Sequence, residues 1–353
     1  MKRLIIVFIC LMPLPLLAQL TTAVPFMVVA TDARSVAMGE TGVATTPDVN
    51  ALYWNAAKYA FVTDQAGGAV SYAPWMRHLE KGKNLGALNA FFRFSQRHTV
   101  AVGGRFFTYG KIDMFDLNGR PDGTESPRDF SVDVAYAFRF DHSWSASVTF
   151  HYIHSDALAG VAEAASGFAA DLAVYFNRKS TLWDRPVLWG VGLNLSNLGP
   201  KLSYGEGLNN NYLPANLRLG GSAAVELCPK HALSLTVELN KFLVPGMKTN
   251  PAGMNYIPDE SVFEGISDSF ADGFASIAWG AGAEYTWNHW LKARAGYHLQ
   301  HKDWGDRRYF TCGVGAEYTG VLLDVAYRLP ASGDSPFRNS WGVTLGYRLK
   351  GKK

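Results

Sequence analysis

Cysteine is scarce in this sequence of 353 residues. Of its three cysteines, Cys10 lies in an apolar N-terminal stretch, which leaves Cys228 and Cys312 for the remaining chain. Two cysteines are too few for a disulfide framework, and we do not expect them to pair. No His/Cys cluster has the spacing of a zinc site. The formal net charge of +3 is too small to favour nucleic acid. We therefore expect no metal, no cofactor and no nucleic-acid partner.

Long hydrophobic runs are also missing. After the first twenty residues, no apolar run approaches the ~18 residues that a membrane helix needs. The mean hydropathy is close to zero, yet the chain has 21 Phe, 16 Tyr, 10 Trp and 35 Gly. Near-neutral hydropathy with many aromatics is expected of membrane strands in which lipid-facing and lumen-facing residues alternate.

Sequence motifs for catalysis are equally scarce. There is no G-x-S-x-G motif, and no Ser/His/Asp set has a spacing that identifies a triad. Asp133, Asp171, Glu238, His151 and His298 fall within the strands described below. Their positions are more typical of a polar lumen lining than of catalytic acids or bases. We therefore expect no catalytic residue and a protein that is not an enzyme.

Residues 1–18 have the pattern of a secretory signal peptide. Lys2 and Arg3 form a charged start, Leu4 to Leu17 an apolar core, and Ala18 is a small residue at the cleavage point. Gln19 follows, where a lipoprotein would need cysteine. Two prolines interrupt the apolar core, which makes a membrane anchor the weaker alternative. We expect export of the mature chain.

From Gly67 onward the chain alternates apolar and polar residues with the period of 2 that β-strands have. In Phe130–Phe140, for example, Val134 and Phe138 fall on one face and Asp133 on the other. The alternation predicts fourteen strands, at 67–76, 85–95, 99–109, 128–140, 143–154, 166–177, 187–198, 215–227, 231–242, 276–287, 290–301, 309–319, 320–329 and 339–349. A tilted strand of about eleven residues covers the ~25 Å apolar band of an outer-membrane barrel.

The connections between these strands alternate in length. The long ones are 77–84, 110–127, 155–165, 199–214, 243–275, 302–308 and 330–338, whereas the others are short except for 178–186. Transmembrane barrels have this alternation, with the long loops extracellular. A soluble sandwich or propeller explains it less well. We predict an all-β, 14-stranded antiparallel transmembrane β-barrel over 67–349, followed by a basic tail at 350–353.

The register of the strands predicts which residues face the membrane. Charged residues in mid-strand should point into the lumen, because a charge facing lipid is costly. We therefore expect Asp133, Asp171 and Glu238 to face inward. The apolar positions Phe138, Val148, Leu172 and Leu235 should face lipid or a partner barrel.

Val24 to Phe61 differs from the strands. It is dense in small residues, has no clean period, and is broken by Gly39, Gly42 and Pro47. Such a segment is either a surface arm or a plug inside a barrel. Irregular backbone at membrane depth must be shielded from lipid, so we predict that residues 19–66 form a plug, or hatch.

Several motifs in this segment resemble the hatch of FadL-type outer-membrane proteins. The matching hatch positions are Asp32, Arg34, Gly39, Gly42, Trp54 and Asn55. Asn55-Ala56-Ala57 departs from the Asn-Pro-Ala that FadL-type hatches often have, and could turn less rigidly. With further blocks such as Gly192–Gly199 and Leu213–Gly220, the resemblance covers roughly residues 24–349. Within the superfamily the chain is similar to the PorV (also LptO) family of the type IX secretion system.

This resemblance implies a role in protein secretion at the outer membrane. It implies that the barrel binds a SprA/Sov-type translocon barrel and receives cargo proteins by their C-terminal signal domains. Delivery would be to a PorU-type sortase that attaches anionic lipopolysaccharide. Outer-membrane lipid and lipopolysaccharide are further implied partners. The alternatives are a FadL-like transporter of hydrophobic small molecules and a factor in lipid A deacylation.

Loops 199–214 and 243–275 are two of the long connections on the predicted extracellular side. Loops beyond ~12–15 residues are usually functional or disordered. Loop 243–275 has no basic residue after Lys248 to match its acidic residues, which are Asp259, Glu260, Glu264, Asp268 and Asp272. The loops form either a solvated lid or a docking surface. For docking we expect contacts from Tyr204, Leu208, Tyr212, Pro245, Met247, Phe263 and Phe270.

Overall fold

The computed structural model describes residues 22–77, 82–116, 118–206, 210–250, 255–301, 307–331 and 340–351. The predicted signal peptide, Leu208 and the last two residues of the predicted basic tail lie outside these ranges. In the described part of the chain, no helix is long and apolar enough to cross a membrane.

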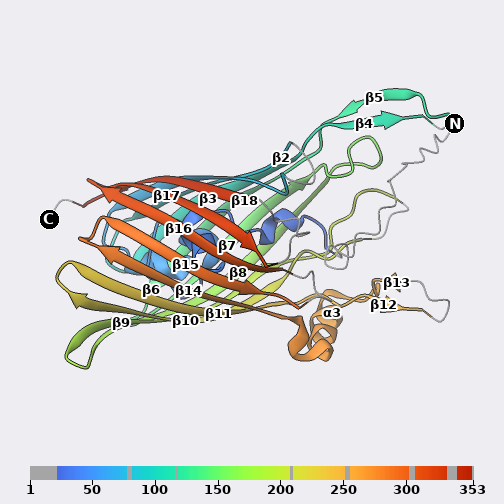
Figure 1. The fold of residues 1–353 in the computed structure, drawn as a ribbon. Helices are drawn as coiled ribbons and strands as arrows, with labels where there is room; N and C mark the ends of the chain where they lie inside the picture. The colour runs from blue at the N-terminus through green and yellow to red at the C-terminus, as the bar shows by residue number, and fades with distance from the viewer. Residues whose placement is uncertain are drawn as a thin grey trace.

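Fourteen antiparallel strands close into one barrel (Figure 1). They are β1 (Ala66–Pro74), β2 (Lys83–Arg93), β3 (His98–Tyr109), β6 (Arg128–Arg139), β7 (Trp144–Ser155), β8 (Ala165–Leu182), β9 (Arg185–Leu198), β10 (Asn216–Cys228), β11 (His231–Phe242), β14 (Ile277–Trp287), β15 (Leu291–Leu299), β16 (Arg308–Tyr318), β17 (Val321–Pro330) and β18 (Ser340–Leu349). β1 pairs with β18, which closes the barrel and leaves no open edge. The predicted fold class is confirmed.

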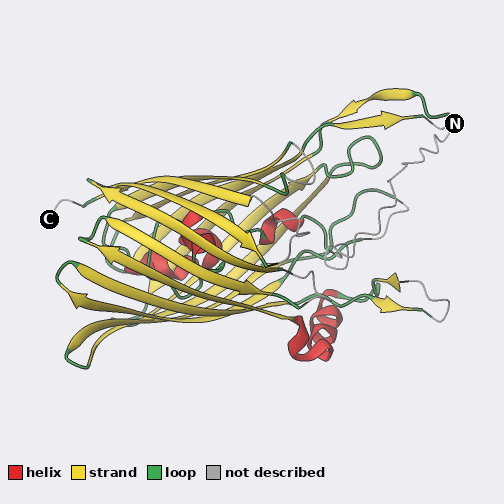
Figure 2. Cartoon of the chain, in the orientation of Figure 1, coloured by secondary structure: helices red, strands yellow, loops and turns green. Residues whose placement is uncertain are grey.

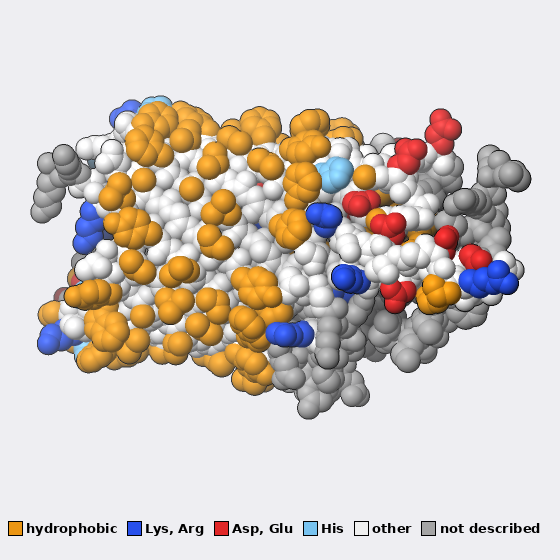
Figure 3. Space-filling view, turned by 90° about the horizontal axis from the view of Figure 1, so that it is seen from above, with side chains coloured by type: hydrophobic (Ala, Val, Ile, Leu, Met, Phe, Trp, Pro, Cys, Tyr) orange, Lys and Arg blue, Asp and Glu red, His pale blue; other side chains and the backbone are white. Residues whose placement is uncertain are grey.

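The two faces of the wall have the predicted chemistry. Leu172 and Leu235 are each 52% exposed on the outside, whereas Asp133, Asp171 and Glu238 are buried inside. Phe138 and Val148 also lie at outward positions of their strands. Figure 3 shows the resulting belt of hydrophobic side chains around the wall. The predicted register is therefore confirmed. Cys228 and Cys312 are exposed free cysteines.

One end of the barrel has tight turns. The sequence predicted a long connection at 178–186, and this prediction is wrong. β8 and β9 continue to Leu182 and Arg185, so only Trp183 and Asp184 connect them. Both have positive φ, 48° and 60°, as the two central residues of a type I′ hairpin turn require.

The other end carries the long loops (Figure 1). They include the hairpins β4 (Ile112–Phe115) with β5 (Pro121–Glu125), and β12 (Lys248–Thr249) with β13 (Asn255–Tyr256). Loop 243–275 also contains helix α3 (Val262–Ser269) and the 3₁₀ segment η4 (Phe270–Ser276). The Ser261 hydroxyl accepts from the Glu264 amide, and the Glu264 carboxylate accepts from the Ser261 amide. This capping box starts the helix.

The segment expected to form a plug lies inside the barrel (Figure 2). Its elements are η2 (Pro25–Val28), α1 (Ala33–Ala37), α2 (Ala51–Trp54) and η3 (Ala56–Phe61). Ala33 N donates to Thr344 Oγ1 of β18 at 2.9 Å, and Gly39 N donates to Thr311 Oγ1 of β16 at 2.9 Å. The short helices thus complete their hydrogen bonding with the wall.

Arginine at position 172 tests the register. We expect Leu172→Arg to destabilise the barrel by about 2–4 kcal/mol, because the charge would face lipid near the middle of the bilayer. Leu349→Arg, at the end of β18, should cost only about 0–1 kcal/mol. Urea unfolding of both variants in lipid vesicles gives the two values, and equal costs would contradict the register.

Candidate functional site

A chain of buried ion pairs joins the plug to the wall. The Arg34 guanidinium donates to Asp48 Oδ2 at 2.6 Å within the plug and to Glu284 of β14 at 3.0 and 3.1 Å. Glu284 Oε2 also accepts from Arg294 Nε at 2.7 Å. Arg294 Nη1 in turn donates to Asp324 Oδ1 at 2.6 Å. Removing one charge from such a chain leaves its partner buried and uncompensated. The predicted hatch residue Arg34 is therefore an anchor.

Glu238 of β11 forms a second anchor. Its Oε2 accepts from the backbone amides of Gly42 and Val43, at 2.7 and 2.9 Å. Its Oε1 accepts from Arg218 Nη1 at 2.9 Å. The wall carboxylate thus binds plug backbone that would otherwise lack partners. Glu238 has a structural role here.

Asp32 and Trp54 fix the shape of the plug itself. Asp32 Oδ1 accepts from the Ser35 amide at 2.9 Å and caps α1, while Oδ2 accepts from Trp54 Nε1 at 2.6 Å. The Trp54 ring lies against Gly42, where a Cβ atom would be 2.2 Å from the ring. Glycine at position 42 is therefore required by close packing.

Asn55 stabilises the turn at Asn55-Ala56-Ala57, where FadL-type hatches often have Asn-Pro-Ala. Its Nδ2 donates to Val43 O at 3.1 Å and to Val174 O of β8 at 3.0 Å. Its Oδ1 accepts from Ala57 N at 3.0 Å and caps η3. Three side-chain hydrogen bonds hold the turn that lacks the proline of Asn-Pro-Ala.

Wall glycines provide the seat for the plug, and sequence reasoning missed them. A Cβ at Gly192 would lie 2.0 Å from Val43 O, and one at Gly296 would lie 2.2 Å from Gly39 N. Gly282 is similar, at 2.4 Å from Met38 O. All three glycines occupy inward strand positions. Because they have no side chains, the backbone of the plug can approach the backbone of the wall closely at these points. Gly39 itself has φ +73° and needs glycine for that reason as well.

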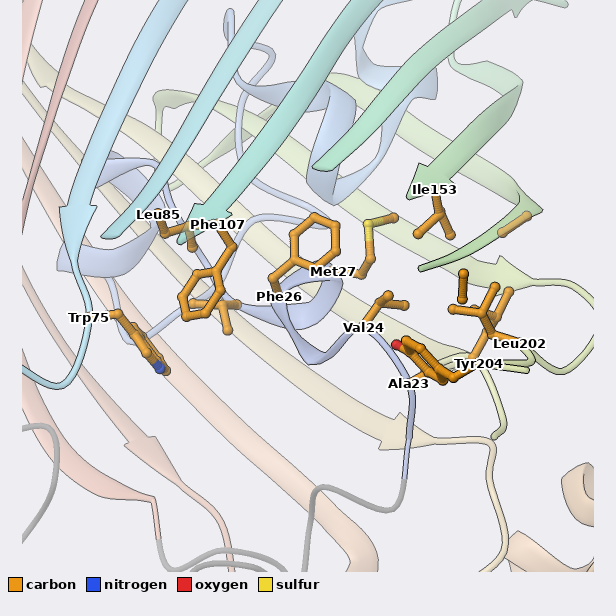
Figure 4. Close-up of a cluster of buried hydrophobic side chains, with 14 of the residues drawn as sticks. Ala23, Val24, Phe26, Met27, Trp75, Leu85, Phe107, Ile153, Leu202 and Tyr204 are labelled. Atoms are coloured by element: carbon orange, nitrogen blue, oxygen red, sulfur yellow. The ribbon is translucent and has the colours of Figure 1, made fainter. Parts of the chain in front are cut away.

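Apolar plug residues fill the lumen near the long loops. Figure 4 shows Val24, Phe26 and Met27 packed with Phe107, Ile153 and other buried side chains. A hydrophobic ligand in this part of the lumen would compete with the plug's own side chains. The apolar space at this level is therefore already occupied.

His151 lies between two carboxylates of the wall. Its Nδ1 is 2.7 Å from Asp133 Oδ1, and its Nε2 is 2.8 Å from Asp171 Oδ1. Asp171 also accepts from the Asn197 amide at 2.7 Å, beside an irregularity in the pairing of β8 with β9. The three buried side chains thus stabilise the wall at this irregularity. The described residues contain no group of three or more His, Cys, Asp or Glu side chains that could hold a metal ion.

Towards the short turns, a lumen cavity of about 250 Å³ is lined by charged groups. Arg34, Glu284 and Arg294 line it together with Lys292 and Asp324. Charges of both signs alternate around it, so its lining suits water better than a hydrophobic ligand.

At the opposite end, the two expected docking loops close over the plug. Ala23 N donates to Tyr212 O at 2.9 Å. The Tyr212 hydroxyl donates to Glu260 O at 2.8 Å and accepts from Glu260 N at 3.2 Å. Lys201 Nζ lies 2.7 Å from Asp259 Oδ1. We call loops 199–215 and 243–276 together the lid.

The expected docking residues separate into two groups. Tyr204, Tyr212 and Pro245 are buried in the lid. The Tyr204 hydroxyl bonds to Ser155, and the Tyr212 hydroxyl donates to Glu260 O. Met247, Phe263 and Phe270 are 41%, 85% and 56% exposed.

Three acidic residues of the lid have lysine partners. Asp259 pairs with Lys201 from the other loop, while Asp268 and Glu260 lie 2.7 and 3.5 Å from Lys248 Nζ. The hydrogen bond to Asp268 raises the pKa of Lys248. Lys201 belongs to loop 199–214, and Lys248 lies at the start of loop 243–275. Both lysines are distant in sequence from their partners, so the pairs could not be predicted from the sequence.

Solved structures with a similar fold include two that are named as toluene transporters. The toluene transporter TodX of Pseudomonas putida has 13% identity and a TM-score of 0.55, covering 91% of this chain and 98% of its own. The toluene transporter TbuX of Ralstonia pickettii has 13% identity and a TM-score of 0.51, covering 91% and 98%. At this identity the likeness shows the fold alone. The protein therefore shares the fold of these proteins, a closed β-barrel.

A family assignment comes from the sequence itself. The model of the family "Type IX secretion system protein PorV" matches residues 17–249, more than half of the chain. The chain belongs to this family, and the resemblance is confirmed. It is therefore an outer-membrane component of type IX secretion. No curated protein matches the chain.

The glycine seat yields a prediction with a matched control. In Gly192→Ala the new Cβ would meet Val43 O at 2.0 Å, whereas in Gly86→Ala the nearest atom is 3.9 Å away. Overpacking of this kind costs about 1–3 kcal/mol, so Gly192→Ala should lower protection of plug amides against hydrogen exchange. Gly86→Ala should leave it unchanged. Equal protection in both variants would mean that the plug is not seated on Gly192.

The ion-pair chain yields a second prediction. Arg34→Met leaves Asp48 and Glu284 without their shared cation, so we expect the plug to lose about 3–5 kcal/mol of local stability. Hydrogen exchange of residues 32–48 measures the loss in the intact barrel. The control is Arg128→Met, at an exposed position of β6, which should leave exchange unchanged. Unaltered exchange in Arg34→Met would contradict the anchor.

Proposed function

We propose that the barrel is a non-enzymatic adaptor of type IX secretion. Its extracellular lid binds the C-terminal signal domain of cargo proteins, and its outer wall contacts the SprA/Sov-type translocon barrel. Cargo then passes to a PorU-type sortase. Membership of the PorV family supports a role in type IX secretion. The geometry of the lumen and the lid supports binding by the surfaces of the barrel and not by its interior.

The observation that carries the proposal is the bonding of the plug to the wall. Arg34 and Glu238 each link plug and barrel through short, buried, charged contacts. A conduit through the lumen would have to break these contacts, and each broken buried pair costs several kcal/mol. The charged residues of the interior thus hold the plug to the wall. We therefore assign binding to the surfaces of the barrel.

The lid has the features of a binding surface. Met247 and Phe263 are exposed, while the Tyr212 and Lys201 contacts and the capping box of α3 hold the loops that carry them. Exposed apolar side chains on a fixed scaffold lose little conformational entropy when a partner covers them. Loops held by a rigid framework commonly carry binding.

A conduit for hydrophobic small molecules is the second candidate. Its support is the fold shared with TodX and TbuX, which are named as toluene transporters. The plug's own side chains occupy the apolar part of the lumen, which favours the adaptor. A role in lipid A deacylation would require an acid–base or nucleophilic centre, and the buried His151 with its two carboxylates is engaged in holding the wall.

Serine at two exposed lid positions tests the adaptor. We expect Met247→Ser with Phe263→Ser to reduce cargo recovered with the barrel from native outer membranes by about tenfold or more, because exposed anchors at an interface centre often contribute about 2 kcal/mol or more. The readout is the amount of cargo that co-purifies and the fraction that remains uncleaved.

The matched control changes exposed apolar residues on another loop. Ile112 and Phe115 of the β4–β5 hairpin are 41% and 50% exposed, and replacing both with serine should leave secretion normal. Normal secretion in the lid variant would sink the adaptor model. Protein-dependent uptake of toluene by cells carrying that variant would then establish the conduit.

A further inference from the structure

An apolar groove lies on the outside of the barrel, beneath the lid. Its volume is about 380 Å³, and it is lined by Leu217, Leu219, Leu239, Lys241, Phe270, Gly273 and Ile277. The leucines and Ile277 come from outward positions of β10, β11 and β14, where Leu219 pairs with Leu239 and Lys241 pairs with Ile277. Phe270 and Gly273 come from η4. The groove is therefore a cleft between the wall and an overhanging part of the lid.

Lys241 holds the overhang in place. It lies on the outward face of β11, yet it is only 7% exposed. Its ammonium donates to Ser269 O at 2.7 Å and to Ser276 Oγ at 2.5 Å, at the ends of α3 and η4. It also lies 5.3 Å from the centre of the Phe270 ring. A cation at the C-terminal end of a helix is favourable, and this one fixes the helical segment against the wall.

The groove is continuous with the lipid-facing wall. Leu219 is 46% exposed and lines the groove. Val237 and Trp279, also at outward positions of β11 and β14, are 61% and 51% exposed. Figure 1 places α3 where the wall ends towards the long loops. The cleft thus opens onto the outer leaflet of the membrane.

We propose that this groove binds an acyl chain of an outer-leaflet lipid. An apolar cleft that opens onto lipid favours a hydrocarbon chain over water or a charged peptide. The bound chain packs between the leucines of the wall and Phe270, and so holds α3 at the membrane surface. Lipid binding here is independent of cargo binding through Met247 and Phe263, and the two are measured separately.

Photo-cross-linking tests the site. The full-length protein is reconstituted in vesicles of phosphatidylcholine that contain a tracer with a diazirine in the middle of one acyl chain. After irradiation, mass spectrometry locates the adducts. We expect adducts on residues 262–277, in addition to those on the exposed wall around Leu345, which is 55% exposed.

Two variants make the result specific. Leu239→Trp fills the groove, and we expect it to reduce the adduct on 262–277 by about tenfold, the change that corresponds to roughly 1.4 kcal/mol of binding. Leu345→Trp, elsewhere on the outer wall, should leave that adduct unchanged. As a folding control, the barrel of each variant should remain folded in detergent without heating, as the unmodified protein does.

A variant that detaches the α3–η4 segment from the wall provides an independent test. Lys241→Met removes the contacts to Ser269 and Ser276, so the adduct on 262–277 should fall while the wall adducts persist. Adducts on the wall but none on 262–277 in the unmodified protein would mean that the groove is closed to lipid. That result, or an equal yield in Leu239→Trp, would overturn the proposal.

Discussion

Backbone amides and carbonyls at membrane depth need hydrogen-bond partners, and the rest of this structure depends on that constraint. The wall meets it by closing β1 against β18. The plug cannot meet it alone, because α1 has five residues and α2 has four, too few for stable isolated helices. Its amides therefore bond to wall groups such as Glu238 and Thr344. Plug and wall complete one another.

The same dependence holds for packing. Where the plug backbone comes closest, the wall has Gly192, Gly282 and Gly296 instead of larger side chains. Without the plug these positions would leave voids in the lumen. The carboxylate of Glu238 would lose its hydrogen bond from Gly42, and that of Glu284 would lose its ion pair with Arg34. Since buried charges are costly when unpaired, an empty barrel of this sequence would be less stable than the filled one. The plug is thus part of the folded core.

The strands could be predicted from sequence because alternation is a local signal. Leu172 and Asp171 are adjacent, and their chemistry alone assigns their faces. Pairings between distant residues leave no such signal, which is why the bond of Arg34 to Glu284, 250 positions away, could not be predicted. Two misses were avoidable. Ser261 and Glu264 have the spacing of a capping box, and the turn at Trp183–Asp184 only required both strands to continue further.

The burial of individual lid residues could not be predicted for a related reason. Aromatic residues in a loop suit both an interface and a small core, and composition does not distinguish them. Tyr204 donates to or accepts from Ser155 and is buried, while Phe263 in the same lid is 85% exposed. The difference arises from which residues the two loops present to each other.

Wall, plug and lid are each bonded to the other two, and these contacts limit where binding can occur. The lid bonds to the first described residues of the plug through Tyr212 and Ala23. The plug bonds to the wall through Arg34, and the lid bonds to the outer wall through Lys241. A change at any of these contacts alters the support of the lid, whereas Phe263 and Met247 are exposed on it. Side chains that are exposed but unneeded for the fold are the ones free to serve a partner. We propose that Met247 and Phe263 of the lid serve a partner in this way.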